Sequence, residues 1–375
     1  MAAAELRETF EREGVVIIRG AVPREQVAQL RSSLEEVFSR TDVDVAGMRT
    51  DMNSAAQTAR TDGKGDTVLV DQPEDGAPPG RFLTEIEAGR THRGLREFEH
   101  HSTLPVVVGE LLGTRQLRFF GDHCFLKEPG AGLHTAFHQD APYFRWDGDM
   151  AAVCWVPVDP VTASSGGMRY VKGSHRWPQY APRLLYSNEP IDPSASSYAP
   201  ELPDNAELMA TAEILSWDCQ PGDVIIHHPN TVHGSGGNIT VDKRRLAASI
   251  RYVGDDVRWH NKPTATAGLT NLLEQWHSAR KVGPSQSGSV ESNERSSLSS
   301  SSKPGMTSDD AASQLSPEQM YQYASVLAGV EMQDGDAFDA RESARIAFPV
   351  VWEHTTHGES KQVATVDRTT ARTRL

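Results

Sequence analysis

The stretch PGDVIIHHPNTVHGSGGN, from Pro221 to Asn238, contains the pattern that decides the fold class. A proline-glycine-aspartate turn precedes the short apolar run Val224–His228, and a glycine-rich turn follows His233. Short β-rich runs bounded by glycine and proline are typical of strands. Four more runs of this kind lie between residues 117 and 253, and they read LRFFGDHCFLK, MAAVCWVPVD, GGMRYVKGSH and RRLAASIRYV. Many short strands with such turns indicate a sandwich or barrel rather than a doubly wound sheet.

The segments before this region are predicted to contribute helices, one strand and loops. Residues 5–13 are predicted to form a helix, VVIIRG at residues 15–20 a short buried strand, and residues 23–38 an amphipathic helix that begins at a proline. Residues 41–90 are polar and rich in Gly and Asp, a composition that predicts long loops. We expect this segment and residues 179–210 to be candidate lids over a functional site.

The C-terminal part of the chain differs in composition. Residues 285–302 are dense in serine and poor in apolar residues, which predicts a flexible linker or insertion over residues 281–310. Residues 316–327 are predicted to form one further helix, with a serine cap and proline in the first turn. We therefore expect a main domain over residues 1–280 and a C-terminal helix and tail, residues 311–375, that pack on it.

Charge and composition limit the classes of partner. A chain of 375 residues with 38% hydrophobic residues can bury a substantial core. A formal charge of −14 and a pI near 5.5 oppose a phosphate-binding surface, so we expect neither nucleic acid nor an anionic membrane as a partner. The N-terminus lacks the apolar run of a signal peptide, which predicts a cytoplasmic protein. Nothing in the pattern specifies an oligomeric state.

The three cysteines, Cys124, Cys154 and Cys219, are widely spaced and odd in number. Neither a disulfide framework nor a thiolate zinc site has this pattern. We expect each cysteine to be a small buried residue.

Residues that commonly bind metals occur at two places. In an extended strand the side chains of His138 and Asp140 project from one face, so an imidazole nitrogen and a carboxylate oxygen can reach one point. Two ligands do not complete a site, and we predict that His233 supplies the third. His227 and His228 compete with it, and their plainer interpretation is that they close a strand and form local hydrogen bonds.

An arginine is expected beside this site. Arg244 begins the run RRLAASIRYV eleven residues after His233. Strand alternation places it on one face, predicted to point inward, with Leu246, Ala248, Ile250 and Tyr252; Arg245, Ser249 and Arg251 fall on the other face. Because a buried, unpaired guanidinium costs several kcal/mol, we expect Arg244 to pair with an anion, which need not belong to the protein.

Two histidines, a carboxylate and a nearby arginine form the constellation of non-haem Fe(II) oxygenases. The chain resembles the phytanoyl-CoA dioxygenase family of Fe(II)/2-oxoglutarate-dependent oxygenases over roughly residues 5–253. The resemblance rests on the order and spacing of EREGVVIIRG, FHQD, CWVPVDPVTASSGGMRYVKGSH, PGDVIIHHPNTVHGSGGN and RRLAASIRY. It implies a mainly β protein with flanking helices, whose core is a double-stranded β-helix, or jelly roll, with iron at one mouth.

The resemblance also implies roles for single residues. The implied iron ligands are His138, Asp140 and His233. Arg244 matches the arginine that pairs with the distal carboxylate of 2-oxoglutarate, and Ser235 and Trp155 match positions that line this cosubstrate. Lys127 is a further cosubstrate candidate, although a solvated lysine at the end of a strand is the plainer interpretation. Tyr143, Phe144 and Trp146 are predicted to line a substrate pocket, although aromatic residues after a strand are as often part of a core.

The implied reaction is oxidation of an unactivated C–H bond in a small organic molecule, by hydroxylation, desaturation or ring closure. Its cofactors are Fe(II), 2-oxoglutarate and O₂, it releases succinate and CO₂, and ascorbate is a possible stimulant. The acidic composition and aromatic lining favour a neutral or cationic substrate, such as a secondary metabolite. The alternatives are a zinc-dependent hydrolase, which needs no buried arginine, and a non-catalytic jelly-roll binding protein, which would lose the ligands. A halogenase is disfavoured because it needs a small residue in place of Asp140.

Overall fold

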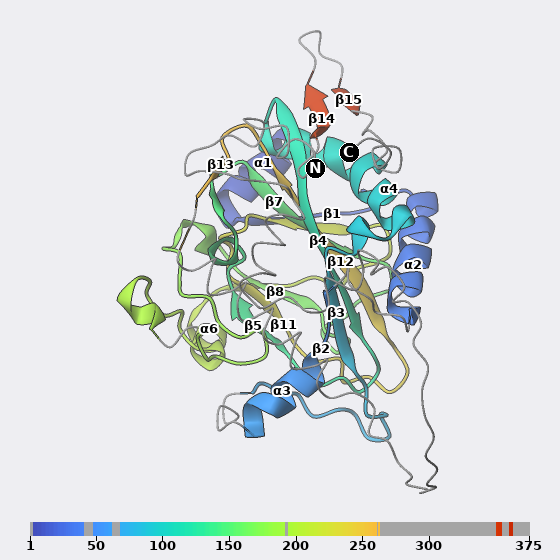
Figure 1. The fold of residues 1–375 in the computed structure, drawn as a ribbon, viewed down its shortest axis with the longest axis vertical. Helices are drawn as coiled ribbons and strands as arrows, with labels where there is room; N and C mark the ends of the chain where they lie inside the picture. Colours follow the sequence, from blue (N-terminus) through green and yellow to red (C-terminus); the bar gives the residue numbers. More distant parts are fainter. Residues whose placement is uncertain are drawn as a thin grey trace, which may run out of the picture.

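Two opposed antiparallel β-sheets form the body of the protein in the computed structural model, which describes residues 3–40, 48–61, 68–191, 194–260, 262, 350–354 and 360–362 (Figure 1). The large sheet runs in the order β1 (Val15–Ile18), β10 (Val224–His227), β7 (Ala151–Pro157), β12 (Arg245–Val253), β4 (Gln116–Lys127), β14 (Val350–His354) and β15 (Ser360–Gln362). From β4 the sheet also continues through β3 (Phe82–Ile86) to β2 (Met48–Asp51).

The small sheet faces the large one and runs in the order β5 (Thr135–His138), β11 (His233–Ser235), β8 (Met168–Val171) and β9 (Ile214–Leu215). A two-stranded ribbon, β6 (Trp146–Asp147) with β13 (Arg258–Trp259), lies apart from both sheets in the pairing order. This arrangement of short antiparallel strands in two facing sheets is a jelly roll. The predicted fold class, mainly β with flanking helices, is confirmed.

The described α-helices pack on different parts of the two sheets. They are α1 (Ala3–Glu13), α2 (Arg24–Ser39), α3 (Met52–Thr61), α4 (Arg93–His101), α5 (Leu104–Leu112) and α6 (Asn205–Thr211). Apolar side chains of α2, α4 and α5 share one core cluster with alternate residues of β12, which are Leu246, Ala248, Ile250 and Tyr252. Figure 1 shows α2 and α4 beside the large sheet, away from the small one. The main core therefore lies outside the space between the sheets.

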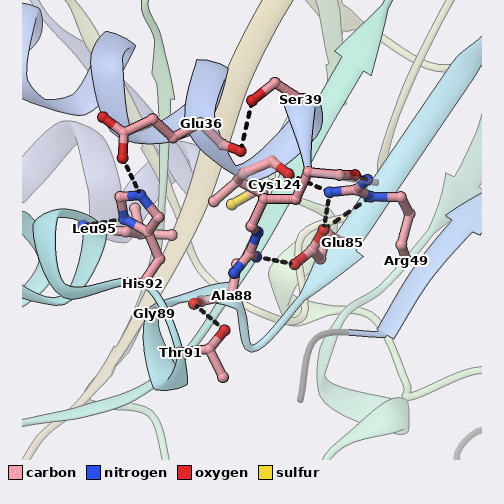
Figure 2. A network of polar contacts seen from close by, with 12 residues as sticks. Glu36, Ser39, Arg49, Glu85, Ala88, Gly89, Thr91, His92, Leu95 and Cys124 are labelled. Atoms are coloured by element: carbon pink, nitrogen blue, oxygen red, sulfur yellow. Dashed lines mark hydrogen bonds and ion pairs between the residues drawn. The ribbon is translucent and has the colours of Figure 1, made fainter. Parts of the chain in front are cut away.

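The expectation of long loops over residues 41–90 is wrong in part, because β2, α3 and β3 lie within this segment. Strand β3 pairs with β4 from Phe82↔Lys127 to Ile86↔His123 and so extends the large sheet. The polar residues that hid the strands are paired with one another: Arg49 donates to Glu85 at 2.7 and 2.9 Å, and Arg40 donates to it at 2.9 Å. Figure 2 shows the Arg49–Glu85 pair. Ion pairing thus replaces the apolar alternation that usually reveals a strand.

Several predictions concern residues outside the described part of the chain. The serine-rich segment 285–302, the helix at 316–327 and the domain boundaries at 280 and 310 fall there and stay predictions. Two short pieces beyond them are described, and β14 pairs with the first residues of β4. All three cysteines are buried and free. Among the described helices, no helix combines the length and the apolar character that a membrane crossing requires.

Candidate active site

The three predicted metal ligands meet at one end of the small sheet. His138 is the last residue of β5 and pairs directly with His233, the first residue of β11. Asp140 lies just beyond the strand end in a helical conformation, so the ligands come from a strand and the turn after it rather than from one extended strand. The Asp140 Oδ1 atom lies 3.4 Å from His138 Nε2 and 3.9 Å from His233 Nε2. One ligand atom from each residue lies within 4.8 Å of the others, a spacing that can hold a metal ion.

Hydrogen bonds to the backbone orient both imidazole rings. His138 Nδ1 lies 2.8 Å from the carbonyl oxygen of Ala136, and His233 Nδ1 lies 2.9 Å from that of Thr231. Because a carbonyl oxygen only accepts, each Nδ1 carries the proton and each Nε2 presents its lone pair to the centre. The backbone therefore selects the tautomer that binds metal.

The protonation states also suit a metal. Burial lowers the pKa of His233 well below its usual value, which leaves its ring neutral at pH 7. Burial alone would raise the pKa of Asp140, but Arg251 and the neighbouring imidazoles hold it well below its usual range. Metal binding needs a neutral imidazole and an ionised carboxylate, and His233 and Asp140 are in these states at neutral pH.

His227 and His228 do not join the ligand set. His227 Nδ1 lies 3.1 Å from the carbonyl oxygen of His228, and His228 Nδ1 accepts from the Asn230 N–H at 3.1 Å. Burial lowers the pKa of each to about 4, so both rings are uncharged at neutral pH. His227 packs 4.2 Å from the ring of His233, between centroids, and so supports a ligand without being one.

The ligands open into a cavity between the two sheets. Its volume is about 160 Å³, which is room for several small groups, since one water needs roughly 10–15 Å³ by the same kind of measure. The large sheet contributes inward-facing residues of β3, β4, β7 and β12, and the segment 183–191 contributes further residues. Strand β3, which was not predicted, therefore forms part of the wall.

Arg244 does not reach this cavity, so its predicted position is corrected. Its side chain is 42% exposed, is bonded to Glu35 of α2, and lies 3.5 Å from Asp159. The predicted alternation of β12 is right, but the face that carries Arg244 packs against the helices. Both faces of the strand are largely buried, so the more apolar face, on which Arg244 was placed, is not the face that lines the cavity.

Arg245 is the arginine that faces the cavity. It is 1% exposed, it lines the cavity, and its guanidinium lies 5.7 Å from the centroid of the Trp155 ring. Its Nε is buried, and no hydrogen-bond partner for it is found in the described part of the chain. Burial lowers the pKa of Arg245 to about 10, which still leaves the group charged at neutral pH. A buried cation without a counterion is a binding site for an anion.

The other predicted cosubstrate residues surround Arg245. Lys127 pairs with it across the strands, and Trp155 and Ser235 line the cavity. Lys127 is fully buried, and its Nζ donates to Ser235 Oγ at 3.0 Å, to the Gly236 carbonyl at 2.7 Å and to the Leu133 carbonyl at 3.0 Å. The interpretation of Lys127 as a solvated lysine is therefore wrong. Burial and the charge of Arg245 lower the pKa of Lys127 well below its usual value.

The predicted substrate aromatics divide into two groups. Tyr143 and Phe144 line the cavity, and the Tyr143 hydroxyl donates to the Arg183 carbonyl at 2.5 Å. Trp146 is corrected, because it stacks on the Phe144 ring within a small core cluster and does not line the cavity. At 2% exposure, Trp146 fits the alternative interpretation, in which an aromatic residue after a strand is part of a core.

Two residues that line the cavity were not predicted as site residues. His123 lies on β4 and Arg251 on β12, each on the same face of its strand as Lys127 and Arg245. Burial lowers the pKa of His123 well below its usual value. The signal was present in the sequence, because positions of equal parity on a strand share a face.

The sequence matches a known family and known proteins. Residues 10–246 match the family model described as "Phytanoyl-CoA dioxygenase (PhyH)". A protein named "Probable phytanoyl-CoA dioxygenase" from Caenorhabditis elegans is 24% identical over 264 residues, which are 68% of this chain and 76% of that protein. The "Multifunctional dioxygenase ausE" of Aspergillus calidoustus is 26% identical over 267 residues, 68% of this chain and 74% of that protein. Among solved structures, the epimerase SnoN in complex with Fe³⁺, alpha ketoglutarate and nogalamycin RO is similar with a TM-score of 0.49 and 20% identity, over 80% of this chain and 96% of that one.

Proposed function

Because the chain belongs to the phytanoyl-CoA dioxygenase family, we propose that it is an Fe(II)/2-oxoglutarate-dependent oxygenase that oxidises a C–H bond of a small organic substrate. The predicted family and the predicted class of enzyme, a dioxygenase, are confirmed by this membership. The observation that carries the proposal is the shared cavity, in which three metal-ligating side chains and a buried guanidinium without a counterion face one space.

The ligand set fits Fe(II). Two imidazoles and one carboxylate that bind from one side leave the remaining positions of an octahedral ion open, as in the non-haem Fe(II) oxygenases. His138 and His233 would bind through Nε2 and Asp140 through Oδ1, the atoms that face one another here. The burial of all three residues, at 5–7% exposure, limits the access of bulk water to the ion.

The arginine fits 2-oxoglutarate. This cosubstrate is a dicarboxylate, and one of its carboxylates must lie away from the metal. A planar guanidinium binds a carboxylate through two parallel hydrogen bonds. Arg245 can offer them because no carboxylate in the described part of the chain forms an ion pair with it. Ser235 offers a hydroxyl nearby, and the Trp155 ring lines the same part of the cavity.

The chemistry is divided between cofactor and protein. When bound, Fe(II) and 2-oxoglutarate supply the oxidising power, with O₂ reduced as 2-oxoglutarate is converted to succinate and CO₂. The protein binds and orients these groups and excludes water. Tyr143 and Phe144 contribute aromatic walls that hold an organic substrate beside the ligands. We propose that the product is a hydroxylated, desaturated or cyclised form of that substrate.

The proposal is tested by binding in the absence of O₂. Protein reconstituted with Fe(II) under anaerobic conditions is titrated with 2-oxoglutarate, and the visible absorption that a chelated iron–ketoacid complex produces is recorded. We expect a saturable absorption change that is absent when Zn(II) replaces Fe(II) and absent in Asp140→Ala. A zinc-dependent hydrolase predicts instead tight Zn(II) binding and no affinity for 2-oxoglutarate with either metal.

A further inference from the structure

Two polar side chains on the cavity wall take no part in the proposed binding of iron or cosubstrate. They are His123 and Arg251, and both line the cavity together with the metal ligands. His123 pairs across the strands with Ser249, which lies two residues before Arg251 on the same face of β12. The two side chains are therefore diagonal neighbours on the inner face of the large sheet.

Among the described residues, Arg251 forms a single ion pair, and its distance is long. Its Nε lies 3.8 Å from Asp140 Oδ2, and its guanidinium lies 5.1 Å from the centroid of the Phe144 ring. Within the described residues, the buried Arg251 Nε has no hydrogen-bond partner, although the Arg251 side chain is only 12% exposed. The His123 ring packs on the Phe125 ring, with 4.0 Å between the centroids. Hydrogen-bond donors buried beside a cavity without partners are expected to meet a ligand.

The other charged groups on the wall are already paired. Glu87 accepts from Arg90 Nε at 2.5 Å, and Asp122 accepts from the N–H groups of Ala88 and Gly89 at 3.0 Å each. The Arg183 guanidinium donates to oxygens of Asn188, Leu202 and Pro203. Glu87 is thus neutralised by Arg90, and among the described residues Asp140 is the carboxylate that forms an ion pair with Arg251.

A bound metal would change the surroundings of Arg251. Asp140 would then act as a metal ligand, and its carboxylate is the one that forms an ion pair with Arg251 among the described residues. A buried cation without a counterion is costly. An anionic group of a ligand beside Arg251 would supply that counterion.

The wall beside Arg251 is apolar. Phe144 lies against its guanidinium, and the cavity is also lined by Ile86, Leu184, Leu185 and Ile191. A ligand that fills this part of the cavity must present hydrocarbon to these side chains.

We propose that the substrate is an apolar carboxylic acid whose carboxylate binds to Arg251, with His123 as a second hydrogen-bonding group. The proposal rests on the proposed oxygenase function and names the substrate class of that site. It replaces the expectation of a neutral or cationic substrate, which followed from the charge of the whole chain. The negative charge of the chain is a property of its total composition, whereas the free charges of the cavity wall are cationic.

The test measures binding without turnover. Protein loaded with Zn(II) and saturated with 2-oxoglutarate is titrated by calorimetry with octanoate, decanoate and cyclohexanecarboxylate, and with the primary amides of the same skeletons. At least one acid should bind at least ten-fold more tightly than its amide. Arg251→Gln should weaken binding of that acid roughly ten- to a hundred-fold, because a charge-assisted hydrogen bond is lost. The affinity of Arg251→Lys for the acid should lie between those of the wild type and Arg251→Gln. This variant therefore separates loss of charge from misfolding.

Matched controls decide the source of the carboxylate. Arg244→Gln changes the residue just before β12, whose side chain is bonded to Glu35 and does not line the cavity, so it should leave binding of the acid unchanged. If no acid binds, if amides bind as well as acids, or if Arg251→Gln has no effect, the substrate class is wrong. If Arg251→Gln instead weakens 2-oxoglutarate binding, the carboxylate beside it belongs to the cosubstrate, and the inference is overturned. If the wild-type protein binds acids through Arg251 but does not bind 2-oxoglutarate, the proposed oxygenase function is wrong and the inferred ligand class stands.

Discussion

Replacing Arg245 by lysine separates the role of this first residue of β12 from that of the adjacent Arg244. The variant keeps a positive charge in the cavity but loses the planar, two-pronged donor that matches a carboxylate. Arg245 is 1% exposed, its Nε has no hydrogen-bond partner and no carboxylate forms an ion pair with it among the residues that the structure describes, so its hydrogen-bonding capacity is available to the cosubstrate. The expected effect is therefore on 2-oxoglutarate binding and not on the fold.

The magnitude follows from the loss of one strong hydrogen bond. A hydrogen bond to a charged group contributes about 1.5–3 kcal/mol. At about 1.4 kcal/mol per decade, Arg245→Lys should weaken the affinity for 2-oxoglutarate roughly ten- to a hundred-fold. Fe(II) affinity in the absence of 2-oxoglutarate should change little, because no metal ligand is altered.

The matched control is Arg244→Lys, at the residue immediately before β12. Arg244 is bonded to Glu35 and lies outside the cavity, so this variant should bind 2-oxoglutarate like the wild type. Both variants are titrated with 2-oxoglutarate under anaerobic conditions at saturating Fe(II). If the affinity for 2-oxoglutarate falls in Arg244→Lys but not in Arg245→Lys, the two arginines are assigned to the wrong faces. If it falls in neither variant, the proposed cosubstrate site is wrong.

Three further predictions concern the ligands, the extended sheet and pH. Alanine at any one of the three metal ligands should abolish Fe(II) binding with little change in the circular dichroism spectrum, whereas His227→Ala should retain the metal; iron retention by a ligand variant would exclude that residue. Glu85→Ala should lower the free energy of unfolding in urea by about 3–5 kcal/mol, because it leaves Arg49 without its buried partner, and a loss below 1 kcal/mol would contradict this role. Burial raises the pKa of Asp122 to about 7, so the folded state binds the extra proton between about pH 4 and pH 7. The wild type should therefore lose stability relative to Asp122→Asn as the pH rises through this window, and a constant difference between the two would show that Asp122 is ionised throughout.

The metal ligands could be predicted from the sequence because their chemistry is specific. A His-x-Asp pair followed by a histidine before a glycine-rich turn has few structural explanations. The position of Asp140 differs in detail, since it lies in the turn after β5. The tautomers of the two histidines depend on carbonyl groups whose directions only the fold determines.

The arginine could not be assigned from alternation alone. Alternation shows that Arg244 and Arg245 point to opposite faces of β12, but it does not show which face meets the helices. The apolar row that begins at Leu246 packs against α2, α4 and α5, whereas the cavity face carries the charged and polar side chains. In an enzyme whose core lies outside the sheets, the more apolar face is the wrong guide to the site.

The walls of the cavity were the least predictable part. Strand β3 is hidden in a segment dominated by polar residues and turn clusters, and its pairing with β4 depends on contacts distant in the sequence. Trp146 looks like a pocket residue by its position after the metal strand, but its neighbours Ala151, Val253 and Val257 bury it in a core cluster. Such choices depend on packing between segments, which no local pattern contains.

The central claim is that the three ligands and Arg245 together make this chain a 2-oxoglutarate-dependent iron oxygenase. The most direct measurement is succinate formed from 2-oxoglutarate by protein reconstituted with Fe(II) and exposed to O₂, in the presence of the acid that binds best to the Zn(II) form. We predict succinate and consumed O₂ in equal amounts, with none formed by the Zn(II) form, by Asp140→Ala or without O₂. Fe(II)-loaded wild-type protein that binds both ligands but forms no succinate would contradict the account.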